Sequence, residues 1–260
     1  MLLKDKVVLI TGGGRGIGKY IARKMCEQGA KIAISSRNER NIEKTRKDFE
    51  KQSGFEILII RADITLKDQV NDVVDKTMEK YGKIDVLINN AGTGGMNPIT
   101  WLDDGQWFAI LETNLHGLYL VTKAVLKAMK QNKNGGRIIN IASHLSKTSF
   151  PCYTAYCTAE HAILGFTRSL ALEVARDGIT VNAICAGLID TDFAKKRTFE
   201  MADQLSLPQR EYTQNIINSI PIKRLIDPLE VASLAVYLAS DPAQAVTGQA
   251  IDINGGLLVP

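Results

Sequence analysis

Residues 7–18, Val7-Val8-Leu9-Ile10-Thr11-Gly12-Gly13-Gly14-Arg15-Gly16-Ile17-Gly18, decide the fold. The apolar run Val7–Ile10 has the length and β-branched content of a buried strand, and a helical pattern starts after the glycines. Glycine lets backbone N–H groups approach a phosphate closely, and a helix N-terminus favours its negative charge. The stretch therefore predicts a strand, a phosphate-binding turn and a helix in succession.

The same alternation of short apolar runs and amphipathic stretches continues along the chain. The other predicted strands are Lys31–Ser35, Ile57–Arg61, Val86–Asn89, Arg137–Ile141, Thr180–Ile184 and Ala250–Ile253, and the predicted helices are Gly18–Glu27, Arg40–Gln52, Lys67–Lys80, Gln106–Gln131, Ala155–Ala175 and Leu229–Ser240. This order is typical of an α/β protein with a doubly wound parallel sheet of the Rossmann type, about seven strands with helices on both faces. We expect a single domain over residues 1–260. Within it, the charged and weakly periodic stretch 192–221 is interpreted as a substrate lid.

Composition narrows the class of protein. The chain has 260 residues, of which 45% are hydrophobic and 23% charged, which suits one α/β domain. It has neither a run of 18 apolar residues nor a signal-peptide pattern, so we expect no membrane span and a cytoplasmic location. The net charge of +4 is scattered, which argues against nucleic-acid binding. The four cysteines lack metal-ligand spacing, so neither a metal site nor a disulfide is expected.

The glycine spacing identifies the kind of phosphate site. The common pattern GxGxxG fails because Ile17 stands where its third glycine is required, whereas Gly12-x-x-x-Gly16-x-Gly18 fits. Candidate residues for binding the pyrophosphate are Gly12, Gly14, Arg15, Gly16, Ile17 and Gly18.

The end of the second predicted strand indicates which dinucleotide is bound. An acid at this position would hold a ribose 2′-hydroxyl, but the chain has Ser36 and Arg37, with Arg15 in the glycine turn. Two guanidinium groups suit a 2′-phosphate, so NADP(H) is the predicted cofactor. In the alternative reading, Arg37 only covers the sheet edge in solvent.

Further along the chain, the segment Asn89-Asn90-Ala91-Gly92, Ser143 and Tyr156 follow the glycine turn in a fixed order. This order resembles the short-chain dehydrogenase/reductase family over essentially the whole chain. The resemblance implies further cofactor contacts. They are Asp63 and Ile64 at the adenine, Asn90, Ala91 and Gly92 near the ribose, and Gly187, Ile189 and Thr191 at the carboxamide.

The resemblance also implies catalytic roles. Asn114 would hold a water in a proton relay, Ser143 the substrate carbonyl, and Tyr156 would exchange the proton. The family has a lysine four residues after the tyrosine, which orients the ribose hydroxyls; this chain has Glu160 there, whose carboxylate can accept hydrogen bonds from both hydroxyls, so Tyr156 and Glu160 are also predicted cofactor contacts. Residues four apart share a helix face, so this carboxylate should raise the pKa of Tyr156, whereas a lysine would lower it. We expect this change to favour carbonyl reduction, which uses the protonated phenol.

We therefore predict an NADPH-dependent reductase of a ketone, such as a 3-oxoacyl thioester or a polyketide carbonyl carried on acyl carrier protein or CoA. The basic cluster Lys195-Lys196-Arg197 is a candidate contact for such a carrier. One alternative is a cofactor-binding protein with weak or no catalysis, acting as a partner or regulatory subunit. Another is a reductase of an activated C=C bond. By analogy with the family, a homotetramer or dimer is expected.

Overall fold

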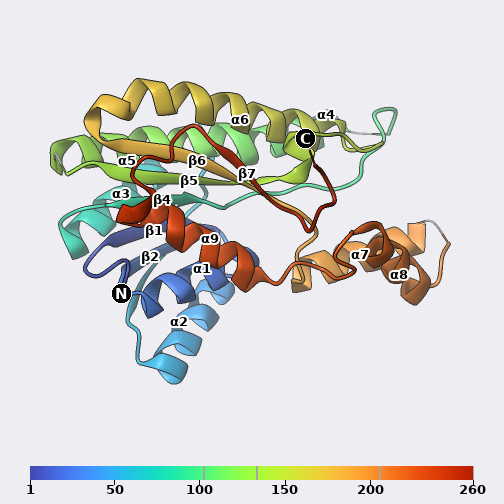
Figure 1. Cartoon of the computed structure of the whole chain (residues 1–260), viewed down its shortest axis with the longest axis horizontal. Coiled ribbons are helices and arrows are strands. Elements are labelled where there is room, and N and C mark those ends of the chain that lie inside the picture. The colour runs from blue at the N-terminus through green and yellow to red at the C-terminus, as the bar shows by residue number, and fades with distance from the viewer. Residues whose placement is uncertain (102, 133, 205, 260) are drawn as a thin grey trace.

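Seven parallel strands form one sheet in the computed structural model, which describes residues 1–101, 103–132, 134–204 and 206–259 (Figure 1). Its spatial order is β3-β2-β1-β4-β5-β6-β7. The strands are β1 (Val7–Thr11), β2 (Lys31–Ser36), β3 (Ile57–Arg61), β4 (Val86–Asn89), β5 (Gly136–Ser143), β6 (Ile179–Ala186) and β7 (Ala250–Ile253). This arrangement confirms the predicted doubly wound parallel sheet.

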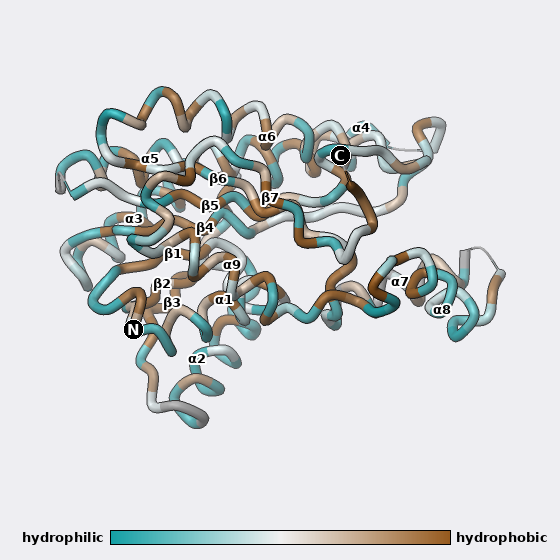
Figure 2. The backbone as a smooth tube through the Cα atoms, in the orientation of Figure 1, coloured by the Kyte–Doolittle hydropathy of each residue, from teal (hydrophilic) through white to brown (hydrophobic). Residues whose placement is uncertain are grey.

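Helices cover both faces of the sheet, as Figure 1 shows. One layer consists of α1 (Gly16–Glu27), α2 (Glu39–Ser53) and α9 (Pro228–Ala239), and the other of α3 (Lys67–Tyr81), α5 (Gly117–Asn132) and α6 (Thr154–Val174). The strands are hydrophobic along their length, whereas the outer helix surfaces carry most of the hydrophilic residues (Figure 2). Because both sheet faces are buried, β6 is buried at every position, including its polar residues Thr180 and Asn182.

The predicted helix Gln106–Gln131 has the correct extent, but its centre is irregular. A π-helical turn, η1 (Glu112–His116), separates α4 (Asp104–Leu111) from α5. Such a turn inserts one extra residue into an α-helix and is frequent at functional sites. Here it contains the buried side chain of Asn114.

Residues 192–221, predicted to form a lid, contain two helices that project from the body as an arm (Figure 1). These helices are α7 (Asp192–Gln204) and α8 (Gln209–Ser219). Short 3₁₀ turns complete the fold at η2 (His144–Ser146), η3 (Ala175–Asp177) and η4 (Asp241–Ala243). None of the helices in the described ranges is long and apolar enough to cross a membrane.

Buried amides tie the centre of the sheet to the helices on one face. Asn89 Nδ2 donates to Thr122 Oγ1 and to Asn140 Oδ1, both at 2.9 Å. Asn140 Nδ2 in turn donates to Thr167 Oγ1 at 2.8 Å. Because all four side chains are buried, each bond replaces one that water can no longer supply. The chain of bonds fixes α5 and α6 relative to β4 and β5.

We expect Asn140→Ala to lower the free energy of unfolding by about 2–4 kcal/mol, because it leaves buried groups of Asn89 and Thr167 without their partner. Urea denaturation measures this change. Asn218→Ala is the matched control, since Asn218 is exposed and its side chain accepts from Gln214 one turn earlier in α8, and it should stay within about 0.5 kcal/mol of the parent. Equal losses in the two variants would contradict the structural role of Asn140.

Candidate functional site

The predicted site residues lie along one edge of the sheet, because the carboxyl ends of parallel strands all point the same way. Strand β5 is longer than predicted and ends at Ser143, which pairs with Ala186 at the end of β6. Gly187 therefore begins its segment beside Ser143. The strand order reverses between β1 and β4, where open α/β sheets form their ligand crevice.

Asn90 joins the two halves of the sheet at this reversal. Its Nδ2 donates to the carbonyl oxygens of Thr11 and Gly12, at 3.0 and 3.1 Å. In return, Thr11 Oγ1 accepts from the N–H groups of Asn90 and Ala91, at 3.0 and 3.1 Å. The turn after β1 and the segment after β4 are thus held together by four hydrogen bonds.

The glycine turn has the shape and charge of an anion site. Gly12 and Gly16 have φ angles of +68° and +53°, in the left-handed region that disfavours other residues. A Cβ added at Gly16 would meet nothing within 4 Å, so the turn is open there. The first turn of α1 contains no acid, and Arg15 precedes it. These features fit a pyrophosphate on the N-terminus of α1.

Gly18 is required for a different reason. A Cβ at Gly18 would lie 2.4 Å from Asn90 Nδ2 and 2.7 Å from the Gly12 carbonyl oxygen. The side chain of Asn90 therefore occupies the space that any other residue at position 18 would need. The remaining loop positions have supporting roles: the Gly14 carbonyl accepts from Thr45 Oγ1 at 3.0 Å, and Ile17 packs against the core.

The structure brings Arg37 and Asp63 together beyond the ends of β2 and β3. Arg37 Nη1 lies 3.5 Å from Asp63 Oδ2, and the Arg37 side chain is 60% exposed. Ser36 Oγ accepts from the N–H of Asn38 at 3.3 Å. An exposed ion pair of this length is weak, so the guanidinium can turn toward an anion at little energetic cost. Ile64, predicted beside an adenine, is buried against Gly117.

Four polar side chains converge where η1, η2 and α6 meet. Asn114 Oδ1 accepts from the N–H of Thr93 at 2.8 Å, and its Nδ2 donates to Glu160 Oε1 at 3.1 Å. Ser146 Oγ donates to the other carboxyl oxygen, Glu160 Oε2, at 3.3 Å. The Ser143 N–H donates to Ser146 Oγ at 3.2 Å, which links Ser143 to this carboxyl, and Ser143 Oγ accepts from the N–H of Leu145 at 3.1 Å. The predicted residues Asn114, Ser143 and Glu160 thus form one network.

Burial dominates the protonation of this network. Glu160 is 4% exposed, and burial raises its pKa to about 7, against the lowering effect of donors from Asn114, Ser143 and Ser146. Burial, and next the nearby charge of Glu160, raise the pKa of Tyr156 above its ordinary value of 10.0. A hydrogen bond with the Ser143 side chain acts in the opposite direction. Tyr156 is therefore a protonated phenol at neutral pH, as expected.

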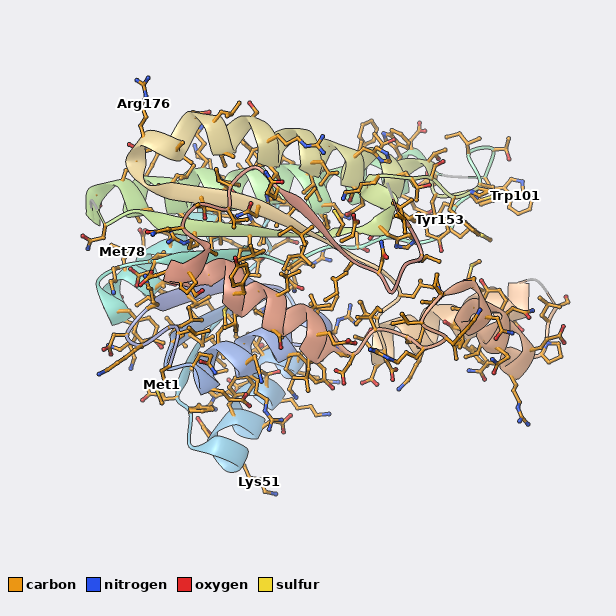
Figure 3. All side chains as sticks on the ribbon, in the orientation of Figure 1. Met1, Lys51, Met78, Trp101, Tyr153 and Arg176 are labelled. Atoms are coloured by element: carbon orange, nitrogen blue, oxygen red, sulfur yellow. The ribbon has the colours of Figure 1, made fainter. Side chains whose placement is uncertain are left out.

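Aromatic rings surround the phenol. The rings of Tyr153 and Tyr156 meet edge to face with centroids 6.2 Å apart, and Phe150 meets Tyr153 in the same way at 5.8 Å. Gly94 lies against Tyr156, since a Cβ there would be 2.4 Å from its ring. In Figure 3 Trp101 projects at the outer end of the molecule, and Tyr153 lies further in.

The carboxamide segment predicted after β6 forms the base of the arm. The Gly187 N–H donates to the Ile253 carbonyl at 3.0 Å, and Ile189 forms a parallel bridge with Ile226. Thr191 Oγ1 accepts from the N–H of Ala194 in the first turn of α7 at 3.2 Å. The segment and the start of α7 are therefore joined by a direct hydrogen bond.

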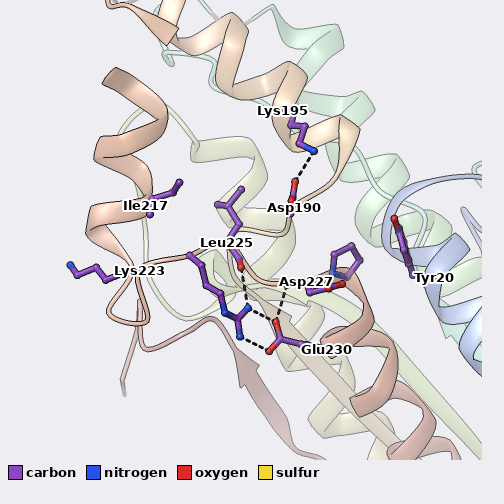
Figure 4. Close-up of a pocket in the computed structure, with 10 residues that line it drawn as sticks. Tyr20, Asp190, Lys195, Ile217, Lys223, Leu225, Asp227 and Glu230 are labelled. Carbon is purple, nitrogen blue, oxygen red and sulfur yellow. Dashed lines mark hydrogen bonds and ion pairs between the residues drawn. The ribbon is translucent and has the colours of Figure 1, made fainter. Parts of the chain in front are cut away.

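A groove of about 750 Å³ lies beside the base of the arm, away from Tyr156. The Lys195–Asp190 ion pair at 3.0 Å lies on its wall (Figure 4). Of the predicted basic cluster, the side chains of Lys196 and Arg197 lie outside the described residues. Across the described chain, no three His, Cys, Asp or Glu side chains are grouped to hold a metal.

Sequence reasoning did not identify Ser146, Thr93 or Gly94 as site residues. Ser146 lies three residues after Ser143, and its hydroxyl in that turn is the only sequence signal that could have suggested it. The roles of Thr93 and Gly94 are a main-chain N–H and a missing Cβ, which leave no trace in residue type.

Comparison with known proteins gives consistent matches over the whole chain. Residues 12–258 match the family model described as enoyl-(acyl carrier protein) reductase. A Streptomyces coelicolor protein provisionally named a ketoacyl reductase is 38% identical, over 97% of each chain. The 3-oxoacyl-(acyl-carrier-protein) reductase of Haemophilus influenzae is 34% identical, over 98% of this chain and 99% of its own. A variant of actinorhodin polyketide ketoreductase crystallised with NADPH superposes with a TM-score of 0.93 and 37% identity, over 97% of each chain.

We expect Gly18→Ala to lower the free energy of unfolding by about 1–3 kcal/mol, because the added methyl displaces Asn90. Gly165→Ala is the matched control. Gly165 also lies within a helix, α6, but a Cβ there would meet nothing within 4 Å, so alanine should stabilise by about 0.5–1 kcal/mol. Urea denaturation measures both, and changes of the same sign would contradict the contact between Gly18 and Asn90.

Proposed function

The chain belongs to the short-chain dehydrogenase/reductase family, and on that premise we propose that it reduces a ketone to an alcohol with NADPH, using Tyr156 as the proton donor. The observation that carries the proposal is the protonated phenol of Tyr156 next to Ser143, at the sheet edge that also bears the glycine turn. Relatives named as ketoacyl reductases support ketone reduction.

The residues present fit the cofactor. The open turn at Gly16 and the N-terminus of α1 suit its pyrophosphate, and the exposed guanidinium groups of Arg15 and Arg37 suit a 2′-phosphate. Asp63, Asn90 and the segment from Gly187 are proposed to contact the rest of the dinucleotide. When bound, the reduced nicotinamide supplies the hydride. A neighbour structure contains NADPH, which supports a cofactor of this kind.

Side chains of the protein itself are proposed to bind the carbonyl oxygen and to supply its proton. The Ser143 hydroxyl is proposed to hold the substrate carbonyl oxygen by donating a hydrogen bond. As the carbonyl carbon gains hydride, its oxygen takes the proton of the Tyr156 hydroxyl, which leaves a phenolate. Asn114, which is buried in the π-helical turn and bonded to Thr93 and Glu160, is proposed to bind the water that returns a proton. Each turnover then restores the protonated phenol.

The substrate is proposed to be a 3-oxoacyl thioester or polyketide carbonyl, as the names of the relatives suggest. Carriage on acyl carrier protein or CoA, closure of the α7–α8 arm as a lid, assembly into a dimer or tetramer, and a cytoplasmic location remain predictions. The ring of Tyr153 lies beside that of Tyr156, and Phe150 packs against Tyr153; both are proposed to contact the substrate.

One observation favours a second candidate, a cofactor-binding protein with little turnover. Burial and the carboxylate of Glu160 both raise the pKa of Tyr156, which makes the phenol a poorer acid. If the protein binds NADPH but reduces none of a panel of ketones, acyl thioesters and enones, and Glu160→Lys restores turnover, this candidate is correct. Turnover of enones alone would instead indicate reduction of an activated C=C bond.

We expect Tyr156→Phe to lower the rate of ketone reduction at least about 100-fold, because phenylalanine has no proton to give. The loss of NADPH absorbance measures the rate, and NADPH binding should not change. Tyr153→Phe, three residues earlier, removes a neighbouring phenol and should keep most of the activity. The assignment fails if Tyr153→Phe, and not Tyr156→Phe, abolishes turnover.

We expect Arg37→Ala to weaken NADPH binding about 10–100-fold while leaving NADH binding nearly unchanged, since a charged hydrogen bond to the 2′-phosphate is lost. Titration of the protein with each nucleotide measures this. Arg176→Ala, which removes one positive charge at another end of the molecule (Figure 3), is the control and should change neither affinity. Tighter binding of NADH than NADPH by the parent protein would contradict the cofactor assignment.

A further inference from the structure

Ser146 links two of the proposed site residues through one hydroxyl. It ends the 3₁₀ turn η2, directly after Ser143, and is 2% exposed. The Ser143 N–H donates to Ser146 Oγ at 3.2 Å, and Ser146 Oγ lies 3.3 Å from Glu160 Oε2. The end of β5 and the first turns of α6 therefore meet at this oxygen.

The direction of these bonds follows from chemistry. An N–H can only donate, so Ser146 Oγ accepts from Ser143; a charged carboxylate can only accept, so the Ser146 hydroxyl donates its one proton to Glu160 when Glu160 is charged. Asn114 Nδ2 donates to the other carboxyl oxygen. Each oxygen of Glu160 thus has one side-chain donor. Both donors favour the charged carboxylate, while burial favours the neutral acid.

We infer that Ser146 is a positioning residue, which orients the main chain of Ser143 and, as one of three donors to Glu160, favours the charged carboxylate through this single hydroxyl. It acts through these residues and not on the substrate. The consequence for catalysis rests on the proposed function, whereas the effect on Glu160 does not depend on it.

Among the side chains around Ser146, Glu160 is the group that gains or loses a proton near neutral pH. The pKa of Glu160 is about 7, while burial raises the pKa of Tyr156 above 10.0 and that of Cys185 on β6 to about 11. Burial lowers the pKa of His144 in η2, so that imidazole is neutral at pH 7. The other titratable or charged groups on described elements packed against this part of α6 are Tyr153, Cys157, Lys147 with Asp252, and the exposed Asp104, Glu112 and His116.

The free energy of unfolding depends on pH because Glu160 has different pKa values in the folded and unfolded states. The ordinary pKa of a glutamate is 4.5, and in the folded protein it is about 7, so between these values the folded state binds more protons than the unfolded state. Stability therefore falls as pH rises through this window and levels off above it. Removing the donor at Ser146 disfavours the carboxylate further, which should move the upper end of the window to higher pH.

The test is urea denaturation of the protein without added nucleotide, from pH 5 to pH 9, for the parent, Ser146→Ala and Glu160→Gln. We expect the decline in stability to end near pH 7 in the parent and about one pH unit higher in Ser146→Ala. Glu160→Gln, which has no ionisable group at this position, should lack this decline. Ser233→Ala removes an exposed hydroxyl of α9, which donates to the Leu229 carbonyl of the same helix, and should match the parent.

The inference is wrong if the pH range over which the free energy of unfolding falls is the same in Ser146→Ala as in the parent. It is also wrong if this fall persists in Glu160→Gln. If Ser146→Ala fails to fold, the Glu160→Gln/Ser146→Cys double variant and Ser146→Cys alone replace it, since a thiol is a weaker donor. The shift should appear in the single variant and vanish in the double.

A rate measurement separates this inference from the proposed function. Ketone reduction should slow as pH rises through about 7, because charged Glu160 makes Tyr156 a poorer proton donor, and Ser146→Ala should shift that profile upward with the stability window. If no variant reduces a ketone, the proposed function fails while the stability data still decide the role of Ser146.

Discussion

The structure depends on the bond between Asn90 and the turn after β1. In a parallel sheet the crevice opens where the strand order reverses, and here that point lies between β1 and β4. At this point the side chain of Asn90 donates to the carbonyl oxygens of Thr11 and Gly12 and so links the segments after β1 and β4. It also occupies the space next to Gly18. The hydrogen bonds from Asn90 to the carbonyl groups of Thr11 and Gly12 hold the glycine turn in its open shape.

A short segment connects Asn90 to the residues proposed for proton transfer. Two residues past Ala91, the N–H of Thr93 bonds to Asn114, and Asn114 bonds to Glu160. The nucleotide end and the catalytic end of the site are therefore parts of one bonded structure. The π-helical turn matters for this reason, since it is the local irregularity that contains Asn114 while α4 and α5 continue on either side.

Glu160 shows how opposing effects set the behaviour of a buried group. Burial alone would keep the carboxyl neutral well above pH 7, and its hydrogen-bond donors alone would keep it charged. The resulting pKa of Glu160 is about 7, so a group that binds a proton near neutral pH lies one helical turn from Tyr156. In the proposed reaction, a charged Glu160 makes Tyr156 a poorer proton donor, whereas a protonated Glu160 does not.

The sequence by itself determined the strand and helix order and the phosphate turn, because periodicity and glycine spacing are local properties of the chain. The set Asn114, Ser143, Tyr156 and Glu160 came from the resemblance to the family and stays a prediction. Only the tertiary structure decided that the helix over 104–132 contains a π turn, that β5 extends to Ser143, and that Ser146 bonds to Glu160. These features depend on which buried polar groups find partners across the fold. Hydrophobic patterns record which residues are buried, and partners for buried polar atoms exist only once distant segments have met.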